Sequence, residues 1–202
     1  MTLGVSIRWY AHEHVVTAAP ELACPFAAFL CGPTTDARPD GCDTVAGITL
    51  SAWRASVLRG VLARAHEVEA DVALTLVVPE FSDKLREFRS HAEEVFGTTL
   101  VPEGLPCKPT SWGVLQWERR QLHDADRVLV WCDFRDHQPG LGLNARPEVA
   151  ELLATSARRV SLAISDRCTA STRFWAQARE AAITPGTTLD HLTDALLAAL
   201  RA

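Results

Sequence analysis

The stretch that decides the fold is RVLVWC, residues 127–132. After its arginine the run is continuously apolar and lacks the in–out alternation of a strand that faces water on one side. Such runs are typical of parallel sheets whose two faces are both covered. We therefore predict a buried strand here, preceded by a helix from about Trp112 to Ala125.

Similar apolar runs recur along the chain and alternate with helical patterns. The predicted strands are a short one at 3–10 and buried ones at 26–31, 72–79, 127–132 and 159–164. The predicted helices cover about 50–66, 82–96, 112–125, 171–182 and 188–201, with another beginning near 147. The alternation predicts one α/β domain with a parallel sheet of about five strands. Such sheets bind ligands at the carboxyl ends of their strands, which here are the loops after Cys31, Pro79 and Cys132.

Composition describes an ordinary globular protein with a net negative charge. The 202 residues carry a formal charge of −5, and 48% of them are hydrophobic. Nucleic acid is not an expected partner, because proteins that bind it generally carry a basic patch. A membrane is not expected either, since no apolar run approaches the ~20 residues of a membrane span. Six cysteines without a CxxC pair or a signal peptide predict a reducing, cytoplasmic setting.

No metal or cofactor site is predicted. His12 and His14 in AHEH do not match the HExxH spacing that puts two ligands on one helical face, so we expect a solvated turn there. GLG at 140–142 is only a fragment of a dinucleotide fingerprint. No GxSxG motif is present, and CGP at 31–33 has no obvious histidine partner. A serine or cysteine nucleophile is therefore not expected.

The segment at 34–47 is a loop by composition, and its length suggests a function. A helix from about Leu50 to His66 follows, with Ser51 as its candidate cap. Arg54 in this helix has two interpretations: it binds phosphate, or it is an ordinary arginine on the helix surface. The tryptophans Trp53, Trp117 and Trp131 are expected in the core, and Trp117 could also edge a base-stacking pocket.

Three carboxylates stand near the ends of strands or helices: Glu118, Asp133 and Glu148. Glu118 lies about two turns before the end of its helix, and Glu148 begins the next helix, so the two can face one cleft at the carboxyl edge. Asp133, just past a strand, is a candidate substrate contact. The alternative is structural, because an acid after Pro147 suits a helix start and Glu118 suits an exposed helix face.

Six short motifs occur in an order and spacing that is more specific than any one of them. They are FLCGPTTD (29–36), WR (53–54), VVPE (77–80), QWE (116–118), ADRVLVW (125–131) and PGLGLN (139–144). Over roughly residues 26–165 this pattern resembles the nucleoside 2-deoxyribosyltransferase-like proteins. Residues 1–25 would then be an N-terminal extension, and 166–202 would form C-terminal helices of a single domain.

The resemblance implies a flavodoxin-like, three-layer α/β/α fold of the broader Rossmann-like kind, and cleavage or transfer at an N-glycosidic bond. Glu148 would be the nucleophile, and Glu118 would contact the base or sugar and assist proton transfer to the leaving base. Gly32 and Pro33 would shape the sugar pocket, and Asn144 would line it. The resemblance also implies a nucleoside or nucleotide as the partner, no cofactor, and a homo-oligomer.

The chain departs from the family pattern at its last motif. Related sequences resemble PGLTTNVEFG, where the glutamate follows the asparagine by two positions. An ungapped match places Arg146 at that position, whereas Glu148 takes the role if the loop carries two extra residues. The alternative function is a nucleotide-binding or interaction module that kept the fold and lost the nucleophile.

Overall fold

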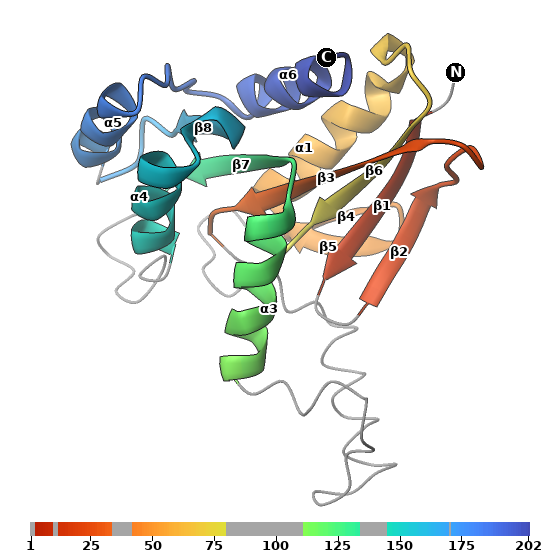
Figure 1. Cartoon of the computed structure of the whole chain (residues 1–202), viewed down its shortest axis with the longest axis horizontal. Coiled ribbons are helices and arrows are strands. Elements are labelled where there is room, and N and C mark those ends of the chain that lie inside the picture. Colours follow the sequence, from red (N-terminus) through yellow and green to blue (C-terminus); the bar gives the residue numbers. More distant parts are fainter. Residues whose placement is uncertain (1–2, 10–11, 34–41, 80–110, 134–144, 170) are drawn as a thin grey trace, which may run out of the picture.

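Helices flank one central sheet in the computed structural model of the chain (Figure 1). The structure describes residues 3–9, 12–33, 42–79, 111–133, 145–169 and 171–202. The predicted helix at 82–96 lies outside these residues. Within them, the predicted α/β class and a mostly parallel sheet are confirmed.

Five parallel strands and one antiparallel edge strand form the sheet. Their spatial order is β2-β1-β6-β3-β7-β8. β2 pairs antiparallel with β1, and every other neighbouring pair is parallel. The strands are β1 (Leu3–Trp9), β2 (His12–Thr17), β3 (Cys24–Cys31), β6 (Val72–Val77), β7 (Arg127–Cys132) and β8 (Val160–Ile164).

Five α-helices lie within the described ranges. They are α1 (Ala52–Ala63), α3 (Ser111–Asp124), α4 (Ala145–Thr155), α5 (Ser171–Glu180) and α6 (Leu189–Leu200). Short 3-10 turns at Ala65–Glu67 and Ala157–Arg159 lead toward β6 and into β8. None of the helices in this part of the chain combines the length and apolarity that crossing a bilayer requires.

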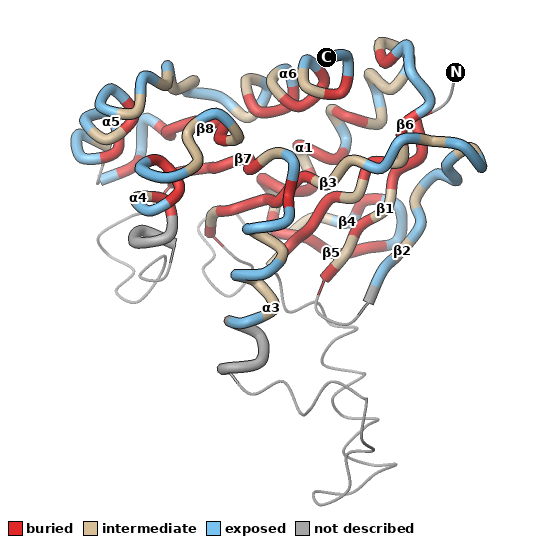
Figure 2. The backbone as a smooth tube through the Cα atoms, in the orientation of Figure 1, coloured by how far each residue is buried: buried red, intermediate tan, exposed pale blue. Residues whose placement is uncertain are grey.

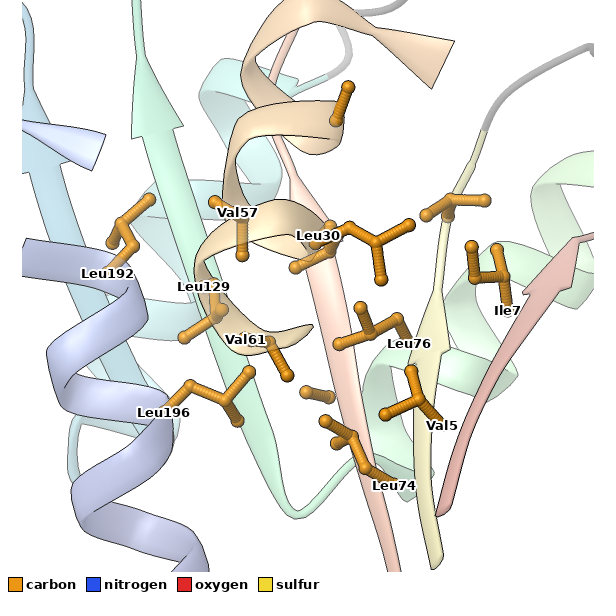
Figure 3. Packing of buried hydrophobic residues seen from close by; sticks show 14 of the residues in the cluster. Val5, Ile7, Leu30, Val57, Val61, Leu74, Leu76, Leu129, Leu192 and Leu196 are labelled. Atoms are coloured by element: carbon orange, nitrogen blue, oxygen red, sulfur yellow. The ribbon is translucent and has the colours of Figure 1, made fainter. Parts of the chain in front are cut away.

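The first core cluster joins the sheet to α1 and α6. Figure 3 shows side chains of the two helices packed over those of the strands. Leu30 of β3 and Leu129 of β7 are 0% exposed. Fully burying a side chain of this size stabilises the fold by roughly 1.5–3 kcal/mol. The labelled members are Val5, Ile7, Leu30, Val57, Val61, Leu74, Leu76, Leu129, Leu192 and Leu196.

The second core cluster takes the alternate residues of the same strands. Phe29 and Cys31 of β3 belong to it, whereas Ala28 and Leu30 belong to the first. This alternation follows from the pleat, which directs successive side chains to opposite faces. Side chains from α4 and α5 complete the cluster, with those of α3 packed against it. β7 is buried from Val128 to Cys132 and is red there in Figure 2, which reflects burial on both faces.

A hairpin occupies part of the segment predicted as a loop. β4 (Cys42–Val45) and β5 (Ile48–Ser51) pair antiparallel between β3 and α1. Ala46 and Gly47 form the turn with φ of 52° and 77°, the positive values that a two-residue type I′ turn requires. The loop prediction was therefore wrong over its last residues. Its first part, 34–41, lies outside the described residues.

Two local predictions near the N-terminal half were also wrong. Ser51 ends β5 and makes no capping hydrogen bond, so α1 begins at Ala52 without a side-chain cap. The histidine stretch forms edge strand β2, not a turn, because its backbone pairs antiparallel with β1. Ser6 and Arg8 of β1 also bind the Glu13 carboxylate. Among the described residues, no group of three histidine, cysteine or acidic side chains could hold a metal.

Charged side chains tie the end of α1 to α6. Arg64 forms ion pairs with Glu67 in the following turn and with Asp194 of α6. Arg201, just after α6, approaches Glu67 at 3.8 Å. These groups are partly or largely exposed, so they fix the position of the helix more than they add stability.

Candidate functional site

The strand order creates a switch point between β3 and β7. These strands are neighbours, but the chain leaves β3 through α1 to reach β6 on one side. It leaves β7 through α4 to reach β8 on the other side. In open parallel sheets, the crevice outside the carboxyl ends of two such strands is the usual ligand site. Gly32, Pro33 and Asp133 follow these two strand ends.

Gly32 is required by a close approach of two backbones. A Cβ at this position would lie 2.7 Å from the carbonyl oxygen of Trp131 in β7 and 3.0 Å from Cζ2 of Trp53. The first contact is with backbone and cannot be relieved by a side-chain movement. The buried Pro33 follows directly, so the end of β3 is pressed against β7 at the switch point.

Trp53 and Arg54 at the start of α1 bind the backbone of this turn. The indole Nε1 of Trp53 donates to the carbonyl oxygen of Pro33 at 2.8 Å. The guanidinium of Arg54 donates to the carbonyl oxygens of Leu30, Gly32 and Pro33. It also lies 4.5 Å from the centroid of the Trp53 ring, within range of a cation–π contact.

Arg54 is 0% exposed, so the interpretation of an arginine on the helix surface is wrong. The phosphate-ligand interpretation gains no support, because the guanidinium is engaged with the protein's own backbone. The sequence contained a signal for this burial. Position 54 shares a helix face with Val57, Leu58 and Val61, all of which are buried.

Asp133 lies buried at the end of β7 next to the chain that follows β8. Its side chain is 2% exposed, and its Oδ2 lies 3.8 Å from Nη2 of Arg167. That distance is an ion-pair contact and too long for a hydrogen bond. The Ser165 amide donates to the Cys132 carbonyl oxygen at 2.9 Å and brings the segment carrying Arg167 beside Asp133. The sequence interpretation had not included Arg167.

Trp117 and Glu118 lie on α3, which precedes β7. Trp117 is half-buried and packs against the second core cluster, as expected of a core tryptophan. Glu118 is also half-buried. A rise of ~1.5 Å per residue puts Glu118 about 10 Å from the helix end, part of the way toward the carboxyl edge.

The last predicted site residues fall at the limits of the described structure. Glu148 and Arg146 both have their backbone in the first turn of α4, which begins at Ala145. Their side chains and the whole of Asn144 lie outside the described residues. The structure therefore gathers Gly32, Pro33 and Asp133 at the carboxyl edge, whereas the positions of the Glu148 and Asn144 side chains stay predictions.

Comparison with known proteins adds no assignment to this geometry. The chain matches no family model, and it matches no curated protein.

Proposed function

We propose that the protein cleaves or transfers the N-glycosidic bond of a nucleoside or nucleotide, on a three-layer flavodoxin-like fold. The observation that carries the proposal is the switch point between β3 and β7. There, two ordered strand ends supply a turn shaped by Gly32 and Pro33 and a buried acid, Asp133. The ordered motifs of the nucleoside 2-deoxyribosyltransferase-like proteins supply the choice of chemistry.

In the proposed reaction the Glu148 carboxylate attacks C1′ of the sugar. A carboxylate–C1′ bond forms, the C1′–N bond breaks, and the base leaves with the electron pair and takes up a proton. A second base, or water, then attacks C1′ and releases the carboxylate, which is the two-step logic of a retaining glycosidase. A position in the first turn of α4 favours the ionised carboxylate, because the positive end of the helix dipole stabilises an anion.

Glu118 has the role of proton donor to the leaving base in this proposal. Helical side chains lean toward the N-terminus of their helix, and α3 runs against the strand that follows it. Glu118 on α3 therefore leans toward the carboxyl edge of the sheet. Its partial burial is suited to general acid catalysis, since exchange with bulk water is limited.

A second candidate function is a nucleotide-binding module without the reaction. Arg146 also has its backbone in the first turn of α4, two positions before Glu148. Positions two apart on a helix do not face each other, so only one of the two registers places a carboxylate at the site. A register with Arg146 there predicts binding of an anionic nucleotide without base release.

Two matched variants of α4 test the nucleophile. Wild-type protein incubated with deoxynucleosides should release free base, and with an added acceptor base should form a new nucleoside. We expect Glu148→Gln to lower the rate by at least ~10³-fold, about 4 kcal/mol of transition-state stabilisation. Glu151→Gln, which changes an exposed acid of the same helix, should keep the wild-type rate. Chromatography of bases and nucleosides measures both.

Two outcomes decide between the candidates. Base release that survives in Glu148→Gln would exclude this nucleophile. Binding of a nucleotide by calorimetry, with no turnover of any nucleoside or nucleotide, would favour the binding module. A homo-oligomer and a cytoplasmic location belong to the same proposal, and light scattering of the purified protein tests the first.

A further inference from the structure

The ladder between β3 and β6 stops early because of a proline. Its last pair is Phe29 with Val77, whereas β3 continues against β7 as far as Cys31. The Val78 amide donates to the Arg8 carbonyl oxygen in β1. Because successive amides of a strand point to opposite neighbours, the amide of residue 79 would point to β3. Residue 79 is proline, which has no N–H to donate.

Arg54 binds the carbonyl oxygen that this proline cannot reach. In the parallel register, residue 79 would donate to the Leu30 carbonyl, one pair beyond Phe29 and Val77. Instead, Nε and Nη2 of Arg54 donate to that oxygen at 3.2 and 2.9 Å. The guanidinium therefore replaces the missing strand amide at the end of β3.

The remaining donors of Arg54 continue along the turn. Nη2 also donates to the Gly32 carbonyl at 3.3 Å, and Nη1 donates to the Pro33 carbonyl at 3.2 Å and to Ser51 Oγ at 3.3 Å. With the bonds to Leu30, all three guanidinium nitrogens thus donate to acceptors in β3, its turn or Ser51. The planar fork thus fixes three carbonyls of β3 and its turn in one geometry, which a lysine ammonium cannot reproduce.

We infer that Arg54 is a positioning residue for substrate, and that Pro79 gives it this role by ending the β6 ladder. The inference rests on the proposed function, in which the Gly32–Pro33 turn shapes the sugar pocket. Arg54 touches the turn from the protein side and acts only through it. Residues from three of the motifs, FLCGPTTD, WR and VVPE, therefore act together to hold the Gly32–Pro33 turn in place.

The first test compares two arginines of the same helix. Arg54→Lys should raise KM for the nucleoside on the order of tenfold with kcat little changed, because a displaced binding turn weakens ground state and transition state alike. Arg59→Lys is the control, since Arg59 is exposed and pairs with Asp43 of the hairpin. Wild-type KM in Arg54→Lys would overturn the inference.

The second test uses the proline. Pro79→Ala restores an N–H aimed at the Leu30 carbonyl, so in the Arg54→Lys background it should bring KM several-fold back toward wild type. In the wild-type background the same substitution should give no such gain, because Arg54 already occupies that oxygen. If Pro79→Ala changes KM equally in the two backgrounds, the proposed coupling between Arg54 and Pro79 is overturned.

Carbonyl ¹³C chemical shifts test the hydrogen bonds of Arg54 without measuring any reaction. In Arg54→Lys the resonances of Leu30, Gly32 and Pro33 should move, that of Phe29 should not, and Pro79→Ala should return the Leu30 resonance. If wild-type protein turns over no nucleoside, the proposed function fails while these shifts still decide whether Arg54 holds the Gly32–Pro33 turn. Unchanged resonances in a folded Arg54→Lys variant would overturn it.

Discussion

At the scale of single residues, Asp126 closes the amino edge of the sheet. Its amide donates to the Ala27 carbonyl at 2.9 Å, and its Oδ2 accepts from the Ala27 amide at 2.8 Å. The two bonds join the entry of β7 to β3, just before Ala28 pairs with Arg127. This edge is opposite to the candidate site, so the AD pair of the ADRVLVW motif has a structural explanation.

We expect Asp126→Ala to lower the free energy of unfolding by about 1–2 kcal/mol, because it leaves the Ala27 amide without its charged acceptor. Asp124→Ala is the control. Asp124 is exposed and its carboxylate contacts the adjacent His123 ring, so we expect a change within about 0.5 kcal/mol. Urea unfolding measures both, and equal losses would contradict the assignment.

Arg54 shows where residue-by-residue interpretation of the sequence failed. A charged side chain on a helix is exposed by default, and this default outweighed the position of Arg54 on the apolar stripe. Its burial depends on carbonyl acceptors at the end of β3, which is distant in the sequence. It also depends on Pro79, which has no amide to occupy the Leu30 carbonyl. Contacts of this kind follow from strand register, which a single sequence does not reveal.

At the scale of elements, the hairpin β4–β5 was not predicted from the sequence. Each strand has only four residues, and an Ala-Gly turn lacks the asparagine or aspartate of a typical type I′ turn. Its contact with α1 combines buried apolar side chains with the ion pair of Asp43 and Arg59, where the Arg59 hydrogen bond lowers the pKa of Asp43. The continuous apolar runs, by contrast, are recognisable from the sequence because strands of a parallel sheet are buried on both faces.

The link between α1 and α6 predicts a pH dependence. Hydrogen bonding to Arg64 lowers the pKa of Glu67 below its ordinary value of 4.5. Its contribution to stability is therefore complete above that value and is lost as the pH falls through the lowered pKa. We expect wild type to melt at a higher temperature than Glu67→Gln at pH 7, and the difference to vanish in acid. Thermal unfolding at a series of pH values measures this, and a constant difference would contradict it.

At the scale of the whole molecule, the sequence predicted the class but not the order of the strands. The apolar runs resemble one another, so nothing in them indicates that β1 pairs outside β6 while β3 lies between β6 and β7. The positions of Gly32, Pro33 and Asp133 at one edge were predictable, because parallel strands end on the same side. The meeting of Glu148 with Glu118 at this edge stays a prediction, because it depends on the register of the loop before α4.

The distribution of thiols predicts a labelling pattern for the folded protein. Cys24 is exposed, whereas Cys31, Cys132 and Cys168 are buried. Burial also raises the pKa of the Cys132 thiol, which removes the reactive thiolate. We expect iodoacetamide to modify Cys24 rapidly and these three only after unfolding, as read by peptide mass spectrometry. Rapid native labelling of Cys132 would contradict the packing at the end of β7.

The strand order also constrains how the chain can fold as it is synthesised. The β1–β2 hairpin is local and can form at once, but Leu3 to Arg8 have no parallel partner until Val72 to Val77 exist. β3 likewise waits for β6 and then for β7. A nascent chain that stops before β6 therefore carries two apolar strands with open edges, the condition under which chains associate wrongly. Synthesis of β6 is thus the step that first allows β1 and β3 to join one sheet, because β6 pairs with both.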